Sequence, residues 1–156
     1  MNNPVSITKT LLQTHWHDGA TPPATLPVVG DVTWATRPFE TWESSPQVCI
    51  WNADIIHTPS SISASPRYNV THMVTIGVYV KVVASTSEAS LVTATDLLWV
   101  LIDEVRRIIL ENPENPDVDV RRIGIGNRWK PDWKLNSAIP NVGYTAPAFL
   151  IYEVSK

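Results

Sequence analysis

The first residues of the chain that could do chemistry are His15, His17 and Asp18, which are metal ligands by type. They lie at the end of a predicted short helix, where residues two positions apart do not face each other. A zinc site also needs further ligands at suitable spacing, and no other residue supplies one. A polar helix end, with imidazoles favourable to the helix dipole, is the better interpretation. We therefore expect no bound metal.

Two further candidates, His72 and Cys49, fall within predicted strands. His72 shares the apolar face of its strand with valines and isoleucines, which is typical of a histidine satisfied within a sheet or at its rim. Cys49 has no histidine nearby in sequence, so we expect a buried, unreactive thiol. The sequence contains no serine nucleophile motif and no phosphate-binding loop, and Gly124-Ile125-Gly126 lacks the third glycine of a dinucleotide site. We expect neither catalysis nor a cofactor.

The most unusual segment is Arg128-Trp129-Lys130-Pro131-Asp132-Trp133-Lys134, which interleaves cations with two tryptophans. Single-stranded nucleic acids are bound by such pairs, and subunit interfaces use the same residue types as anchors. A solvated loop whose tryptophans turn inward is the third alternative. Because Pro131 disfavours a helix, we predict a shaped loop that presents at least one tryptophan outward. We favour the interface, with candidates Arg128, Trp129, Lys130, Trp133, Lys134 and Trp99.

Composition supports assembly over catalysis. The 156 residues are 44% hydrophobic and 17% charged, which is typical of a folded domain. Seven tryptophans are many for this length, and tryptophan is enriched at interfaces. Thirteen prolines against six glycines favour stiff loops, and one cysteine excludes an intramolecular disulfide. The longest apolar run, Leu97 to Ile102, is too short to span a membrane, and we expect no secretory signal.

The charge is unevenly distributed. The net charge of -3 argues against general nucleic-acid binding, which usually requires a basic excess. Residues 121–134 nevertheless carry a local net charge of +4, whereas the first sixty residues carry -3. A head-to-tail contact between copies could use this asymmetry, because it joins two different patches of the same chain.

The elements that must position these residues can be read from periodicity. Tyr68 to Val83 alternates apolar and polar residues with period two, which predicts a long strand. Ser85 and Glu88 match a capping box, and an apolar stripe predicts a helix from Thr86 to Glu111 that ends before Pro113. The other predicted elements are a helix over Val5–Asp18 with Gly19 as its C-cap, and strands over Val28–Phe39, Gln47–Ile56, Val118–Ile125 and Ala146–Val154, the last one central.

This order predicts an α+β fold. We expect a single domain over residues 1–156, in which a mostly antiparallel sheet packs against one long helix. The short N-terminal helix precedes it. A serine- and proline-rich loop over residues 57–67 should form a projecting hairpin tip, and residues 126–145 should form an excursion at an interface.

The segment from Arg67 to Val78 and the helix Leu97 to Asn112-Pro113 resemble the tail terminator proteins of long-tailed bacteriophages, also called tail-completion or neck proteins. The resemblance rests on element order and pattern over most of the chain, and Thr71 to Pro113 is its strongest part. The segments Thr21 to Pro27 and around Trp129 do not map onto it. It implies a non-catalytic subunit of a hexameric ring that caps the tail tube and receives the head–tail connector.

The resemblance also implies location and partners. The protein would be found in the tail or neck of the virion, and in the host cytoplasm during assembly. Its partners would be further copies of itself, the tail tube protein and the head–tail connector protein, with no membrane. DNA could pass through the ring without sequence-specific binding. The alternatives are another head–tail connector, head-closure or tail-tube subunit, or a small metal-dependent enzyme that uses His15, His17 and Asp18.

Overall fold

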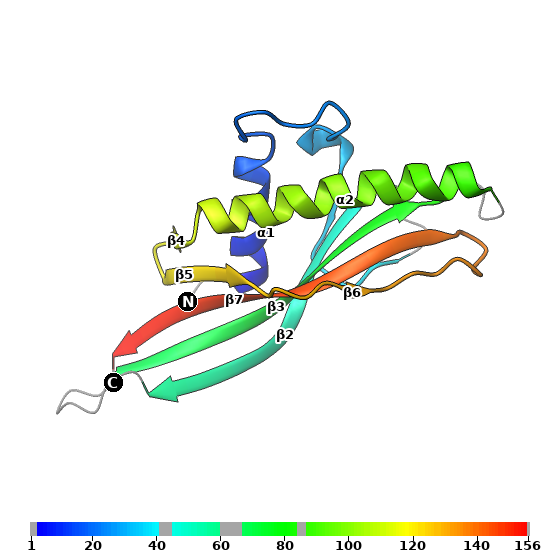
Figure 1. Ribbon diagram of the computed structural model, residues 1–156. Coiled ribbons are helices and arrows are strands. Elements are labelled where there is room, and N and C mark those ends of the chain that lie inside the picture. The colour runs from blue at the N-terminus through cyan, green and yellow to red at the C-terminus, as the bar shows by residue number, and fades with distance from the viewer. Residues whose placement is uncertain (1–2, 41–44, 60–66, 84–86, 156) are drawn as a thin grey trace.

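A long helix, α2 (Glu88–Glu111), lies across one face of a β-sheet in the computed structural model of the protein (Figure 1). The structure describes residues 3–40, 45–59, 67–83 and 87–155. The remaining elements are α1 (Pro4–His15), the short 3₁₀ helix η1 (Val29–Asp31), and strands β1 (Thr33–Ala35), β2 (Gln47–Pro59), β3 (Arg67–Lys81), β4 (Glu114–Asp117), β5 (Val120–Ile125), β6 (Lys130–Pro131) and β7 (Asn141–Ser155). The predicted α+β class, with a mostly antiparallel sheet packed on one long helix, is confirmed.

The described residues form one seven-stranded sheet in the order β1-β2-β3-β7-β5-β4, and β6 also pairs with β7. β1 and β2 are parallel, and the other pairs are antiparallel. β3 and β7 pair continuously from Arg67↔Ser155 to Lys81↔Asn141, so β7 is central, as predicted. It begins at Asn141 instead of Ala146, and residues 141–145 of the predicted excursion therefore belong to the sheet.

The core lies between this sheet and the two helices. Alternate residues of β3, among them Val74, Ile76 and Val78, are fully buried and face the helices. α2 contributes Leu98 and Leu101 to the same cluster, and both are fully buried. The period-two and helical patterns of the sequence therefore identify the core correctly. We call this side of the sheet the helix face and the opposite side the back face.

The back face carries a second, smaller cluster. Cys49 and Tyr79 are buried there, and the ring of Phe39 stacks on that of Tyr79 with centroids 4.1 Å apart. Phe39 lies in the segment predicted as a strand over Val28–Phe39, of which only β1 and η1 have regular structure. Irregular backbone after Ala35 allows Phe39 to cover the sheet.

Two predicted helix ends are wrong. α1 ends at His15, and the left-handed residue after it is His17 (φ 70°) instead of Gly19. The imidazole Nε2 of His17 lies 2.8 Å from the carbonyl oxygen of Leu26, a contact that holds this turn. α2 is capped by Ser87 instead of Ser85, because the Ser87 hydroxyl accepts a hydrogen bond from the amide of Ser90.

One arginine joins the two helices. The guanidinium of Arg107 pairs with the buried carboxylate of Glu104 and with Glu111, whose oxygen lies 2.7 Å from Nη1. It also donates to the carbonyl oxygen of His15 at the end of α1 (2.8 Å). The arginine thus satisfies a carbonyl at the end of α1 and a buried charge on α2 at the same time.

Three strands continue beyond the helices. The outer part of β2, the first part of β3 and the last part of β7 project as an arm past α1 and α2 (Figure 1). Both ends of the predicted loop over 57–67 belong to strands, because Thr58 and Pro59 pair with β3, which starts at Arg67. The rest of that prediction, residues 60–66, lies outside the described residues. Towards the other end, β5 begins at Val120 instead of Val118, and β4 precedes it.

Candidate interaction surface

The segment from Arg128 to Lys134 runs beside β7 at the edge of the sheet, and the predicted loop is only partly correct, because Lys130–Pro131 is a strand. We call the whole segment the 128–134 strand, since its hydrogen bonds to β7 continue to Lys134. β6 pairs Lys130 with Thr145 and Pro131 with Tyr144. The pairing continues, because the amide of Asp132 donates to the carbonyl of Gly143 (2.8 Å) and the amide of Lys134 to Asn141 (3.0 Å). Alternate amides point to β7, so the nitrogen of Pro131 points away from it. Proline is tolerated at such an edge position.

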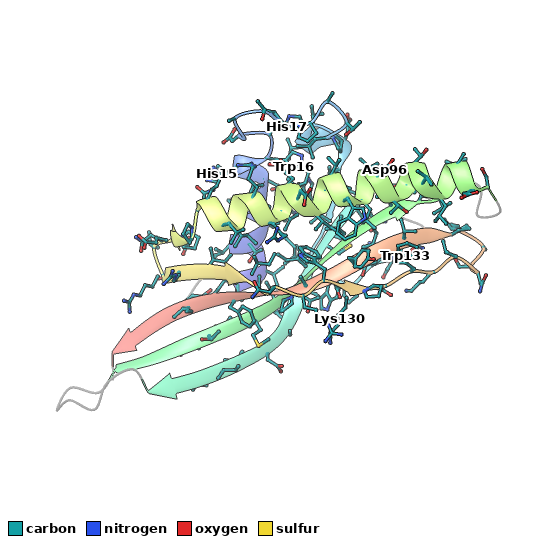
Figure 2. All side chains as sticks on the ribbon, viewed as in Figure 1. His15, Trp16, His17, Asp96, Lys130 and Trp133 are labelled. Atoms are coloured by element: carbon teal, nitrogen blue, oxygen red, sulfur yellow. The ribbon has the colours of Figure 1, made fainter. Side chains whose placement is uncertain are left out.

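Successive side chains of this strand point to opposite faces of the sheet. Tyr144, the partner of Pro131, packs against the main core, whereas the neighbouring Gly143 contacts Tyr79 of the back cluster. Trp129, Pro131 and Trp133 therefore lie on the helix face, and Lys130 and Asp132 lie on the back face. Figure 2 shows Lys130 on the side of the sheet away from α2. One strand thus presents aromatic rings on one face and charges on the other.

The two tryptophans have different environments. Trp129 is partly buried and packs against the main core. Its Nε1 is buried and has no hydrogen-bond partner among the described residues. Trp133 retains 38% of its surface, so the expectation that at least one tryptophan faces outward is confirmed. Trp129 therefore fits the alternative in which a tryptophan turns inward, and Trp133 fits the alternative in which a tryptophan is an interface anchor.

Trp133 belongs to an aromatic patch together with Tyr144 and Trp99. Its ring meets that of Tyr144 edge-on, with centroids 6.1 Å apart. Tyr144 in turn lies 5.4 Å from Trp99, which projects from α2 and is 46% exposed. These aromatic contacts fix the rings in place while leaving their outer surfaces in water. Rigid, half-exposed aromatic rings are typical anchors of protein interfaces.

The cations of the 128–134 strand lie on the opposite face from this patch, and the carboxylate of the same strand is already engaged. Arg128, Lys130 and Lys134 are exposed, and the Lys134 ammonium lies 5.7 Å from the centre of the Phe39 ring. The Asp132 carboxylate accepts a hydrogen bond from the Tyr79 hydroxyl (2.8 Å). Burial, followed by this bond and the negative charge of Asp132, raises the pKa of Tyr79. The free charges at this edge are therefore positive.

Opposite charge lies at the other edge of the same sheet. β1 and β2 form that edge, and the described residues 29–40 and 45–59 carry Asp31, Glu40 and Asp54 against the single cation Arg37. Arg37 is 3.2 Å from the carboxylate of Glu40. The sequence shows two oppositely charged segments, and the structure separates them across the width of the sheet.

The residues considered for catalysis or metal binding do not converge. His15 lies 3.5 Å from Asp18, but His17 turns to the carbonyl groups of Leu26 and Pro27 instead. Figure 2 shows the two histidines on different sides of the end of α1. Across the described ranges, no group of three histidine, cysteine or acidic side chains is placed to hold a metal ion.

His72 and Cys49 take the places expected for them. The ring of His72 packs edge-on against Tyr152 at 4.9 Å, and burial, with a smaller effect of His57, lowers its pKa. Cys49 is fully buried, and this burial raises the pKa of its thiol to about 12. A thiol that stays protonated is a poor nucleophile.

Comparison of the sequence with protein-family profiles and with curated proteins gave no match. Neither described helix combines the length and hydrophobicity needed to cross a bilayer.

Proposed function

We propose that the protein is a ring-forming structural subunit of a bacteriophage tail, of the tail terminator kind. The aromatic patch at the cationic edge of the sheet is the observation that carries this proposal. Trp99, Tyr144 and Trp133 come from three different segments, and two of them are at least 38% exposed. A solvent-facing cluster of large rings, on a strand whose other face carries exposed cations, has the composition of an edge that contacts another protein.

The position of the patch favours a ring. It lies at the opposite edge of the sheet from the acidic segment, so contact between the two edges is heterologous and repeats from copy to copy. The resemblance in element order supports a tail terminator, whose ring caps the tail tube and receives the head–tail connector. The protein would then act in the virion neck after assembly in the host cytoplasm, with DNA passing through the ring.

The proposal is tested by the size and shape of the particles that the purified protein forms. We expect sedimentation velocity and negative-stain microscopy to show closed rings, of six copies if the resemblance holds, which bind the ends of tail tubes. Long polymers would instead indicate a tail-tube subunit. A protein that stays monomeric at all concentrations, alone and with tail tubes, would contradict the proposal.

The aromatic patch is tested by the double variant Trp99→Ala, Trp133→Ala. Both side chains lie at the surface and are half exposed in the monomer, so it should remain folded, whereas loss of anchors that contribute about 2 kcal/mol each should prevent assembly. Leu110→Ala is the matched control, because Leu110 lies on the same helix, is 58% exposed and is distant from the patch in sequence. Normal assembly of the double variant would show that the patch is not the interface.

A further inference from the structure

The outer edge of β2 is open over most of its length. β1 pairs with Gln47, Val48 and Cys49, and no other described strand pairs with that edge as β2 continues to Pro59. Six consecutive residues, from Asn52 to His57, are exposed, and Ile55 and Ile56 retain 59% and 47% of their surfaces. An edge strand of this kind offers unpaired amide and carbonyl groups to another strand.

The two edges of the sheet differ in their protection. Natural edge strands are commonly protected by lysine, proline or a bulge. The strand at residues 128–134 carries Lys130, Pro131 and Lys134. β2 has no lysine, and its first proline is its last residue, Pro59. Its one protective feature is a register shift between Asn52 and Ile55. The apolar side chains and open edge of β2 therefore fit a surface that another strand covers.

We propose that the outer edge of β2 receives the 128–134 strand of a second copy, so that the sheet continues from one protomer into the next. This inference rests on the proposed ring and names the contact that would build it. Charge identifies the occupant: β2 carries Asp54 and no lysine or arginine, whereas the 128–134 strand carries three cations, and its Asp132 is engaged by Tyr79.

The faces of the two edges also correspond. Ile55 pairs with His72, which packs on Tyr152 of the main core, so Ile55 lies on the helix face. Trp133 lies on the helix face at the opposite edge, beside Tyr144. A sheet that continues across the boundary keeps each face on one side, so exposed Ile55 of one copy would cover exposed Trp133 of the next. Pairing of β2 with β2 would instead bring Asp54 near a second Asp54.

The charge pair is tested by a swap. Asp54→Lys alone and Lys130→Asp alone should each raise the concentration for half-assembly by about tenfold or more, because like charges placed across an interface oppose association. The two substitutions in one chain should restore assembly to within about threefold, since every contact then regains opposite charges. Asp18→Lys is the control, because it makes the same charge change at an exposed site outside the sheet.

The apolar contact gives a second measurement. Ile55→Asp should block assembly, whereas Val28→Asp, at a residue 56% exposed outside the sheet, should not. Thermal unfolding of each monomer checks that it is folded. If a charge reversal prevents folding, Asp54→Asn and Lys130→Gln replace it, and both should weaken assembly and reduce its dependence on salt.

The outcomes separate this inference from the proposed function. Rings that form normally in both single charge variants, or that the double swap fails to restore, would overturn the edge contact and leave the ring standing. Particles that stop at two copies would overturn it in favour of β2–β2 pairing and would also contradict the ring. A wild-type protein that never assembles would overturn both proposals.

Discussion

Replacing Trp129 by phenylalanine should cost the fold little, whereas the same replacement at Trp16 should destabilise it. Both rings pack against the main core. Nε1 of Trp16 donates to the carbonyl oxygen of Pro27 (2.8 Å), and its ring meets Trp34 edge-on at 5.2 Å. Nε1 of Trp129 is buried without a partner among the described residues. The two sites therefore differ in whether the indole N–H is satisfied, and Trp16 is the more deeply buried of the two.

The difference in free energy of unfolding follows from this contrast. Phenylalanine buries roughly 40 Å² less than tryptophan, which costs about 1 kcal/mol at either site. At Trp16 the lost hydrogen bond adds about 1 kcal/mol, for a total of about 2 kcal/mol. At Trp129, removing an unpaired buried donor returns about 1–3 kcal/mol, so Trp129→Phe should be neutral or stabilising. These values correspond to a Tm about 4–8 °C lower for Trp16→Phe and a Tm no more than about 2 °C lower for Trp129→Phe.

The measurement is urea unfolding of both variants and the wild type as monomers, followed by circular dichroism. The carbonyl of Pro27 keeps a contact with His17 at 3.1 Å, so Trp16→Phe does not leave it without a partner. Equal losses of stability at the two sites would refute the reasoning, because they would show that the N–H of Trp129 is as well satisfied as that of Trp16.

Two further predictions concern the core and its charges. Arg107→Met should lower the free energy of unfolding by about 3–5 kcal/mol, because it leaves the carboxylate of Glu104, 4% exposed, without its cation. In urea unfolding, adding Glu104→Gln to the Arg107→Met variant should recover part of this loss. The exposed control Glu111→Gln should cost less than about 1 kcal/mol. A small loss of stability in Arg107→Met would contradict the buried ion pair. Above pH 9 the unfolded thiol of Cys49 ionises while the folded thiol, with a pKa of about 12, stays protonated, so the free energy of unfolding falls as the pH rises from 9 to about 12. Cys49→Ala should make this fall less steep, and an unchanged slope would show that Cys49 does not contribute to it.

Local periodicity predicted the parts of the fold that bury a continuous face. The alternation from Tyr68 to Val83 and the stripe of α2 both place their apolar residues in the core. The order of the strands could not be read in the same way. β7 lies between β3 and β5, and β1 is parallel to β2, because contacts between distant segments decide these pairings. Such contacts leave no periodic pattern within either strand.

The aromatic patch was predicted only in part for the same reason. Trp99 and Trp133 were both interface candidates, but nothing in the sequence indicated that they share Tyr144 as a neighbour. That contact exists because α2 crosses the sheet above β7 while the 128–134 strand runs beside it. Tyr144 was missed because the strand that holds it begins earlier than its apolar pattern suggested. Asn141 and Gly143 are buried in this first part of β7, but neither has the large apolar side chain that would have indicated a strand.

The sequence of the 128–134 strand does alternate as a strand would, but Pro131 argues against a strand. From Arg128 to Lys134, aromatic or proline residues alternate with charged residues at every position, which is the period of a strand. A proline normally counts against a strand, but it is compatible with an edge whose free nitrogen faces away from the sheet. Because the period is two, a shift of one residue would exchange the faces and place the cations against the core. Packing of Trp129, the bond from Tyr79 to Asp132 and the pairing of Lys134 with Asn141 oppose that shift. The register that buries Trp129 is thus the register that leaves Trp133 half exposed beside Trp99, so one strand both completes the core of the protomer and presents the proposed interface.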